Sequence, residues 1–189
     1  AALKATDIKR VIAYSTISQI AFILLGLSCG VEVGLAGGLL YILAHSIAKG
    51  GLFLCAGIVE HALHTKDMSK MGGLIKTMPV TAISCLFCAL SVMGIPPFGG
   101  FFAKFLVIDG IVSAGQITLG IIFIIGAIMT VLYLARMFSL VFLGEEKAKA
   151  HEGTKVMLAS VIILAVLSLF MGILINLPTG LVKMVGGLQ

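Results

Sequence analysis

Apolar residues in this chain collect into long runs that are separated by short polar links. The runs are continuous, and the longest reach the roughly 20 residues that an α-helix needs to cross a bilayer. The pattern predicts helical segments at residues 11–29, 33–59, 80–95, 101–112, 117–143 and 156–177. We therefore expect an all-α fold, a polytopic membrane helix bundle of about six transmembrane segments.

The link between the third and fourth segments has a composition that breaks a helix. It reads Gly-Ile-Pro-Pro-Phe-Gly-Gly over residues 94–100. Pro96 and Pro97 lack amide donors and clash with a continuing helix, and glycine weakens the helix further. Two arrangements remain open, which are two separate crossings or one discontinuous helix.

The basic residues favour two separate crossings, and hence six in all. With six crossings, both termini share one side with Lys4, Lys9, Arg10, Lys66, Lys70, Lys76 and Lys183. The other side then carries Lys147, Lys149 and Lys155. A single interrupted crossing would invert the second half, and we expect the bias to disappear in that case. We therefore expect six crossings, with both termini on the inner side.

Composition agrees with a membrane environment. The chain is 60% hydrophobic and 11% charged, with a mean hydropathy of +1.19, whereas a soluble domain carries about 25% charged residues. The net charge of +5 lies in the links, and no basic stripe is interleaved with aromatic residues. A lipid bilayer is therefore an expected partner, and nucleic acid is not.

Few residues suggest metal or catalytic chemistry. Four cysteines occur, at positions 29, 55, 85 and 88. The Cys85-x-x-Cys88 pair supplies too few ligands for a zinc or iron–sulfur site. No nucleotide-binding loop, nucleophile triad or haem-ligand pattern is present, so we expect no metal, no cofactor and no catalytic residue.

Lys49 lies in the middle of the second segment, four residues after His45. A lysine near the centre of a membrane helix costs roughly 2.5–3.5 kcal/mol on insertion scales, so it is kept mainly where a polar pathway or partner receives it. The spacing places both side chains on one helix face, about 6 Å apart along the axis. We interpret the pair as stations in a proton or ion relay. The alternative is that Lys49 snorkels or pairs structurally with a neighbouring subunit.

Lys104 follows the break directly, and a broken helix beside a charge is typical of transporter sites. The alternative is a kink near an interface, with Lys104 facing headgroups. Asp109 lies about 140° around the helix from Lys104, so it marks the far exit of the short helix or contacts another element. Ser18 and Gln19 belong to a polar stripe that we interpret as an interhelical contact, with water binding as the alternative.

Four ordered motifs extend across most of the chain: DIKRVIAYSTISQIAFILLGL, LAHSIAKGGLFLCAGIVEHAL, MGGLIKTMPVTA and GIPPFGGFFAKF. Together they resemble the antiporter-like subunits of respiratory complex I, Mrp-type cation/proton antiporters and membrane-bound hydrogenases. The resemblance covers roughly residues 7–143 and implies the second of two inverted five-helix repeats. Residues 156–177 would add one helix, giving a single membrane domain over residues 1–189 that forms part of a longer subunit.

The resemblance also implies roles for individual residues. Lys49 corresponds to the central-axis lysine between half-channels, Lys104 to the terminal lysine on the broken helix, and His45 to the histidine of the same motif as Lys49. The implied function is translocation of protons, or alternatively sodium, by a subunit of a redox-driven or antiport complex. Because the family's first repeat is absent, unseen sequence or a partner subunit must supply the rest of the path.

These inferences predict an integral membrane protein of an energy-transducing membrane, such as a prokaryotic cell membrane, with other membrane subunits as partners. The chain would belong to an oxidoreductase or antiporter complex without a catalytic centre of its own. Two other functions remain open at this point. One is a non-transporting assembly or scaffold subunit, and the other is a quinone-binding role.

Overall fold

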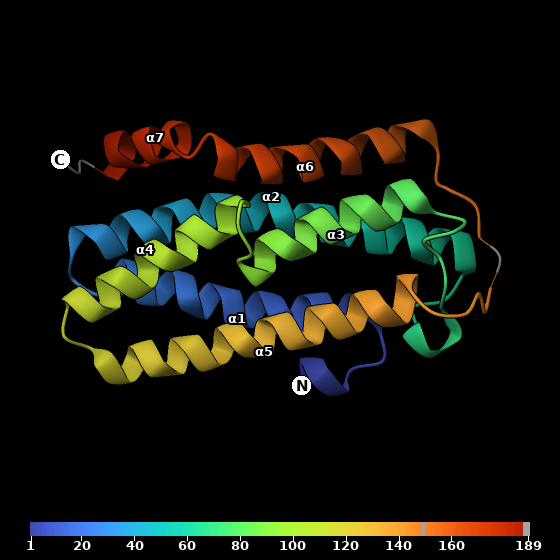
Figure 1. Cartoon of the computed structure of the whole chain (residues 1–189), viewed down its shortest axis with the longest axis horizontal. Coiled ribbons are helices and arrows are strands. Elements are labelled where there is room, and N and C mark those ends of the chain that lie inside the picture. Colours follow the sequence, from blue (N-terminus) through green and yellow to red (C-terminus); the bar gives the residue numbers. More distant parts are fainter. Residues whose placement is uncertain (149, 187–189) are drawn as a thin grey trace.

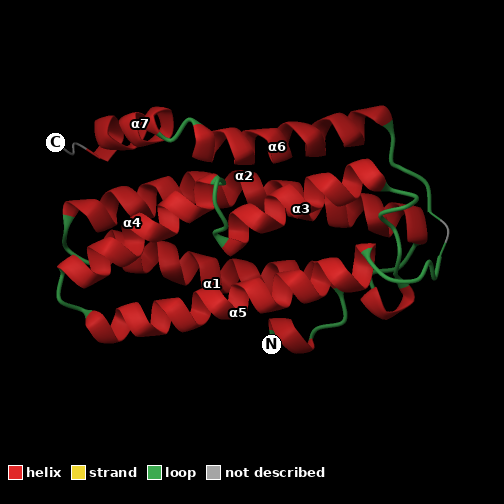
Figure 2. Ribbon diagram, viewed as in Figure 1, coloured by secondary structure: helices red, strands yellow, loops and turns green. Residues whose placement is uncertain are grey.

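The computed structural model describes residues 1–148 and 150–186, and within these ranges its regular elements are all helices (Figure 2). They are η1 (Ala2–Lys4), α1 (Ile8–Ser28), α2 (Glu32–Leu63), η2 (Met68–Lys70), α3 (Pro79–Met93), α4 (Gly99–Ser113), α5 (Ile117–Phe142), α6 (Lys155–Ile173) and α7 (Asn176–Gly186). Four of these, α1, α2, α5 and α6, are long and apolar enough to cross a membrane. The predicted fold class is confirmed, and each predicted segment corresponds to one of the helices α1 to α6.

Helix α2 is the central helix and packs against α1, α3, α4, α6 and α7 (Figure 1). Its N-terminal half approaches α1 closely because glycines face this contact. A Cβ on Gly34 would lie 3.1 Å from the Gly26 carbonyl, and one on Gly38 would lie 2.8 Å from the Leu27 side chain. Small residues allow membrane helices to pack at short distance, so side chains of α2 reach groups on α1 directly.

Helices α3 and α4 lie end to end along α2 (Figure 1). Gly37, early in α2, packs against Val107 of α4, and Gly51, later in α2, packs against Cys88 of α3. The two short helices thus run antiparallel to α2 in succession and make one interrupted pass, so the expectation of two separate crossings is wrong. Each has 15 residues, or about 22 Å of helix, which is shorter than the ~30 Å hydrocarbon core.

The interrupted pass gathers the polar links at one end of the bundle. Ile8 N–H donates to the Lys66 carbonyl at 3.0 Å, Gly73 N–H donates to the Leu143 carbonyl at 2.9 Å, and these bonds join three parts of the chain. The basic residues described at this end are Lys4, Lys9, Arg10, Lys66, Lys70, Lys76, Lys147 and Lys155. The charge bias therefore becomes stronger instead of disappearing, and the positive-inside rule favours this end as the inner one.

The two termini do not share a side as expected. Helix α1 starts at the basic end, whereas α7 lies at the opposite end of the bundle (Figure 1). The expectation failed because each apolar run was counted as a crossing. This assigned every link after the break to the wrong side of the membrane. Lys149 and the side chain of Lys183, which entered the count of basic residues, lie outside the described residues.

The sixth predicted segment is divided in the structure. Helix α6 ends at Ile173, and α7 begins at Asn176, inside the predicted range 156–177. Pro178, which directly follows the predicted range, occupies the first turn of α7, where its missing amide donor is not needed. Near the end of α6, Gly172 packs directly on the Pro97 carbonyl, where a Cβ would overlap it.

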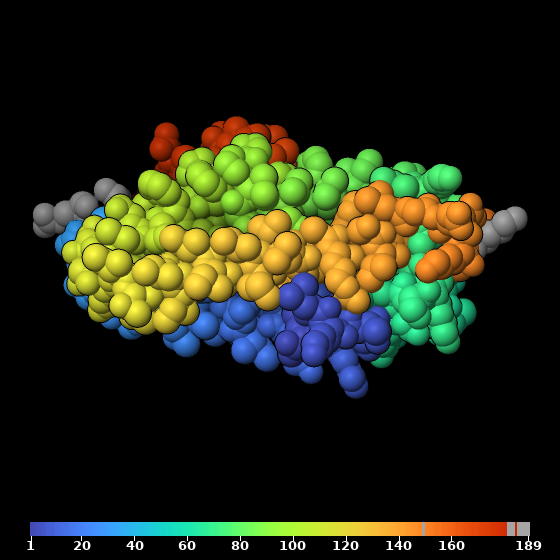
Figure 3. Space-filling model, turned by 60° about the horizontal axis from the view of Figure 1, so that its bottom comes forward, coloured from blue at the N-terminus to red at the C-terminus, as the bar shows by residue number. Residues whose placement is uncertain are grey.

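Helix α5 lies on the outside of the bundle, beside the N-terminal residues (Figure 3). Ile117, Ile121, Ile125 and Ile128 on its outer face are 55–65% exposed. Arg136 fixes the N-terminal segment by donating to the Ala5 carbonyl at 3.1 Å. A continuous exposed isoleucine face of this kind is typical of contact with lipid or another membrane subunit.

Candidate functional site

Lys49 lies near the middle of α2 and is only 5% exposed. Its amine donates to the Ile12 carbonyl at 3.1 Å and to the Ser15 hydroxyl, both on α1. The Ser15 hydroxyl also donates to the Ile12 carbonyl, at 3.1 Å. The amine therefore points into the contact between α1 and α2, which is not the geometry of a lysine that snorkels to a membrane surface.

Lys104 lies in the second turn of α4 and is 6% exposed. Its amine donates to the carbonyls of Val92 and Met93, at 2.8 and 3.1 Å, in the last turn of α3. It also lies 5.8 Å from the centroid of the Phe22 ring on α1. The C-terminal carbonyls of a helix carry partial negative charge, so the break provides Lys104 with an internal site that favours a cation.

The backbone of the break makes room for this lysine. Gly94 has a φ of +81°, which closes α3 in the left-handed region. A Cβ on Gly94 would also lie 2.8 Å from the Lys104 Cδ atom. Both the conformation and the space therefore require glycine at this position. The alternative of Lys104 facing headgroups at a kink does not fit this buried geometry.

Neither buried lysine has a carboxylate partner among the residues that the structure describes. Salt bridges there join Glu60 to Lys9 at 2.5 Å and to Lys66 at 3.4 Å, in the basic end. The acceptors of Lys49 and Lys104 are neutral carbonyl and hydroxyl groups. Each amine can consequently gain or lose its proton without leaving an unpaired buried carboxylate behind.

His45 lies one helical turn before Lys49, as predicted, and is half-buried. Its Nε2 atom is buried and has no hydrogen-bond partner among the described residues. Buried polar atoms without a protein partner commonly bond an ordered water. The structure thus places His45 beside Lys49 but shows no direct bond between them.

Ser18 and Gln19 join a hydrogen-bonded network that links three helices. The Gln19 amide donates to the Thr130 hydroxyl of α5 at 3.0 Å and accepts a bond from the Tyr41 hydroxyl of α2. The hydroxyls of Ser18 and Tyr133 lie 3.2 Å apart. Gln19, Tyr41 and Thr130 are fully or almost fully buried. The predicted interhelical contact is therefore present in the geometry.

Sequence reasoning missed Tyr41, Thr130 and Tyr133. Tyr41 lies eight residues before Lys49, on the same face of α2 as Lys49 and His45, and this periodicity could have identified it. Thr130 and Tyr133 are three residues apart in a nearly uncharged helix, which places them on one face of α5. A search for polar residues at helical spacing from Lys49 would have found Tyr41, but not Thr130 and Tyr133, whose partners lie on other helices.

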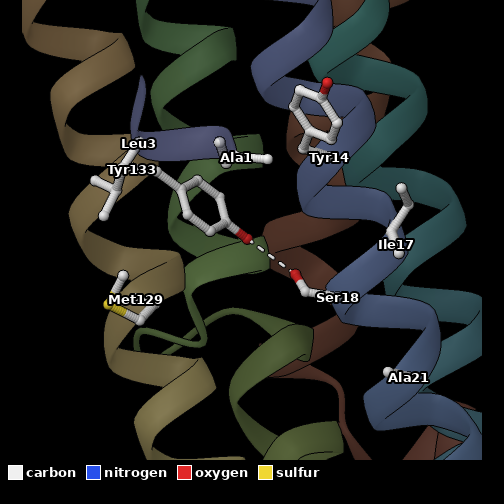
Figure 4. Close-up of a pocket in the computed structure, with 9 residues that line it drawn as sticks. Ala1, Leu3, Tyr14, Ile17, Ser18, Ala21, Met129 and Tyr133 are labelled. Atoms are coloured by element: carbon white, nitrogen blue, oxygen red, sulfur yellow. Dashed lines mark hydrogen bonds between the residues drawn. The ribbon is translucent and has the colours of Figure 1, made fainter. Parts of the chain in front are cut away.

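The network reaches a surface pocket between α1 and α5. The pocket has a volume of about 480 Å³, and Ser18 and Tyr133 lie in its wall. Figure 4 shows the Tyr133 hydroxyl pointing across from α5 to the Ser18 hydroxyl on α1, with Tyr14 and Met129 nearby. The polar network is therefore open to the outside of this chain at one point.

Asp109 does not join these groups. It is exposed, five residues after Lys104 on α4, towards the end of that helix opposite the break. The prediction that it marks the far end of the short helix agrees with this position. No described residue forms a salt bridge with it.

Helix α1 connects the two lysine sites. Lys49 contacts Ser15 and Lys104 lies over Phe22, which are seven residues apart on α1. Seven residues correspond to about 10 Å along a helix. Gln19 and its network occupy the interval, so Lys49, the network and Lys104 follow one another along a single helix.

Removing one hydroxyl of the network tests its contribution to packing. We expect Tyr41→Phe to lower the free energy of unfolding by about 1–3 kcal/mol, because the buried Gln19 carbonyl oxygen loses its donor. Tyr14→Phe is the matched control, since Tyr14 is 41% exposed and lies outside the network. Thermal denaturation of the purified subunit in detergent would measure both; equal midpoints would contradict the expectation.

The sequence comparisons place this geometry in a known family. Residues 1–130 match the family described as NADH:quinone oxidoreductase/Mrp antiporter, TM. The chain belongs to this family. The resemblance seen in the four motifs is confirmed, and so is the expected membrane location.

Members of the family from different complexes are similar to this chain. NADH-quinone oxidoreductase subunit L of Mycobacterium tuberculosis is 40% identical over 174 residues, covering 88% of this chain and 27% of the relative. Na(+)/H(+) antiporter subunit A1 of Staphylococcus haemolyticus is 33% identical over 206 residues, covering 94% of this chain and 26% of the relative. The chain thus spans about a quarter of the length of these family members.

A solved structure of the family has the same arrangement of helices. A chain of the Mrp complex from a Dietzia species superimposes with a TM-score of 0.90 at 26% identity, over 96% of this chain and 42% of that one. The likeness extends across the interrupted pass and α6, so the helix arrangement around Lys49 and Lys104 is that of the family.

Proposed function

We propose that this chain forms part of an ion-translocating membrane subunit, with Lys49 and Lys104 in the ion pathway. The observation that supports this most directly is the burial of two amines, 5% and 6% exposed, on neutral acceptors inside a membrane helix bundle. Ionisable groups at membrane depth are costly and are typical of ion and proton pathways. Neutral acceptors leave each amine free to change its protonation state.

The proposed mechanism is electrostatic. The contact points of the two amines on α1 are about 10 Å apart. At an effective dielectric constant of about 20, two unit charges at this distance repel by about 1.7 kcal/mol. A proton that arrives at one lysine therefore favours release from the other by roughly 15- to 20-fold, which would pass charge along the axis of the bundle.

His45 and the polar network would supply the medium for this transfer. The unpartnered Nε2 of His45 beside Lys49 is a position where water can bond. Ser18 and Gln19, with their partners on α2 and α5, hold the helices together between the lysines. We propose both as secondary residues that pack the pathway, with Ser18 also lining the pocket at its side.

The transported ion is proposed to be the proton, with sodium as the alternative. One relative is named as an Na(+)/H(+) antiporter subunit and another as an NADH-quinone oxidoreductase subunit. Other membrane subunits are the proposed partners, since the Dietzia chain belongs to a multisubunit complex. Residues 7–143 are proposed as the second five-helix repeat of a longer subunit, with residues 156–177 contributing the further helix.

Replacing Lys49 tests the proposed function. In the assembled complex that contains the full-length subunit, reconstituted in vesicles, we expect Lys49→Ala to reduce ion flux at least about tenfold. Assembly should persist, because Ser15 keeps its own bond to the Ile12 carbonyl. Proton flux would be followed with a pH-sensitive dye. A second series of measurements would use an imposed sodium gradient.

Lys70→Ala is the control, because Lys70 is exposed in the link before α3. It removes the same charge outside the bundle and should leave flux near the wild-type value. Full flux in assembled Lys49→Ala complexes would reject the pathway and favour the scaffold alternative. Sodium-dependent flux without proton movement would identify sodium as the ion.

A further inference from the structure

Helix α3 is held by charged side chains at both ends. At its N-terminus, the backbone N–H groups of Val80 and Thr81 donate to Glu152 Oε1 at 2.6 and 3.3 Å, and the Thr81 hydroxyl donates to Glu152 Oε2 at 2.6 Å. At its C-terminus, the last carbonyls accept bonds from Lys104. A carboxylate at the N-terminus and a cation at the C-terminus both complement the helix dipole.

The N-terminal cap comes from a distant part of the chain. Met78, the residue before α3, provides no side-chain cap, and Pro79 has no amide donor. Glu152 lies in the link between α5 and α6, more than 70 residues later in the sequence. The start of α3 therefore has no carboxylate of its own and depends on this link for its cap.

The position of α3 along its axis matters for Lys104. Non-helical segments precede α3 and follow it, and the break at residues 94–98 separates it from α4. The Val92 and Met93 carbonyls that receive the amine move with α3. A contact that fixes the start of α3 therefore also sets where these carbonyls lie.

Helix α6 follows Glu152 in the sequence and extends to the C-terminal end of α3. It packs against α3. Near its end, Met171 lies against Gly99 and Gly172 lies against the Pro97 carbonyl, so α6 also contacts the break. Glu152 and α6 therefore contact both ends of α3: Glu152 caps its start, and α6 packs on the loop that leads from its end to Lys104.

We propose that Glu152 is a positioning residue for Lys104, acting through α3. This inference rests on the proposed function, in which Lys104 belongs to the ion pathway. The carboxylate fixes the start of α3, and thereby the position of the Val92 and Met93 carbonyls at its end, which accept from Lys104. Loss of the negative charge should weaken the site that holds the Lys104 ammonium group without removing any residue from the pathway itself.

The test uses the reconstituted complex with the full-length subunit. We expect Glu152→Gln to reduce flux per assembled complex by about five- to tenfold, within the range for weakening a helix cap. Its pH profile should move to lower pH, because the ammonium form of Lys104 loses stabilisation. Glu152→Asp, which keeps the carboxylate, should recover at least half of the wild-type flux.

Glu145→Gln is the matched control, since Glu145 is exposed in the same link. It should leave both the flux and the pH profile unchanged. The inference would be overturned if Glu152→Gln and Glu145→Gln had the same flux and the same pH dependence of flux. It would also be overturned if Glu152→Gln lowered only the amount of assembled complex and not the flux per complex. If Lys104→Met also keeps full flux, the proposed function fails; if Lys104→Met loses flux while Glu152→Gln does not, only the positioning role fails.

Discussion

Lys104→Met should abolish most ion movement, with flux about a hundredfold or more below wild type in assembled complexes. Methionine has nearly the size and flexibility of lysine, so it can occupy the same channel beside Phe22 without a cavity. It removes the charge and leaves the carbonyls of Val92 and Met93 without their donor. The effect should exceed that of Lys49→Ala, because the variant loses both the charge and the hydrogen bonds that join α4 to the end of α3 across the break.

The measurement is proton or sodium uptake into vesicles that contain the complex, normalised to the amount of assembled subunit. Lys70→Met controls for the same substitution at an exposed lysine and should keep flux within about twofold of wild type. Lys104→Arg tests whether charge alone suffices at this position. Wild-type flux in Lys104→Met complexes would show that the buried amine is structural and carries no ion.

Gly100→Ala should prevent correct packing of the interrupted pass. A Cβ at this position would overlap the Ser91 carbonyl of α3. This carbonyl is part of the backbone, so no side-chain rotation can relieve the overlap. Forcing such a contact apart costs about 1–3 kcal/mol or more. We expect most of the assembled complex to be lost and the remainder to denature at lower temperature.

Gly57→Ala is the matched control on α2, since a Cβ there would meet no atom within 4 Å. Alanine favours a helix over glycine by up to about 1 kcal/mol, so this variant should be neutral or slightly stabilised. Assembly would be followed by native gel and thermal stability by denaturation in detergent. Equal behaviour of the two variants would contradict the close contact between α3 and α4.

Much of the fold and part of the site could be predicted from the sequence. The apolar runs correspond to helices α1 to α6, and the break at residues 94–100 separates two of them, because hydrophobicity and proline act locally. Lys49 and Lys104 were identified by their position in apolar sequence alone. Both are buried in the structure, while their roles in transport stay predictions.

Other features required the three-dimensional structure. Thr130 and Tyr133 were missed because a single hydroxyl in an apolar helix gives no signal until its partners on other helices are known. Glu152 was missed for the same reason, since its partners lie more than 70 residues away. The division between α6 and α7 was missed because Pro178 is compatible with a helix start as well as a helix end.

The sequence by itself determined that this is a membrane helix bundle with two lysines in apolar surroundings and a forced interruption between α3 and α4. These properties depend on the chemistry of neighbouring residues, which sequence displays directly. Only the tertiary structure decided that the interruption makes one pass along α2 and that the amines of Lys49 and Lys104 bond neutral groups on α1 and α3. The direction of a chain after a break, and the partner of a buried charge, depend on packing between helices distant in sequence.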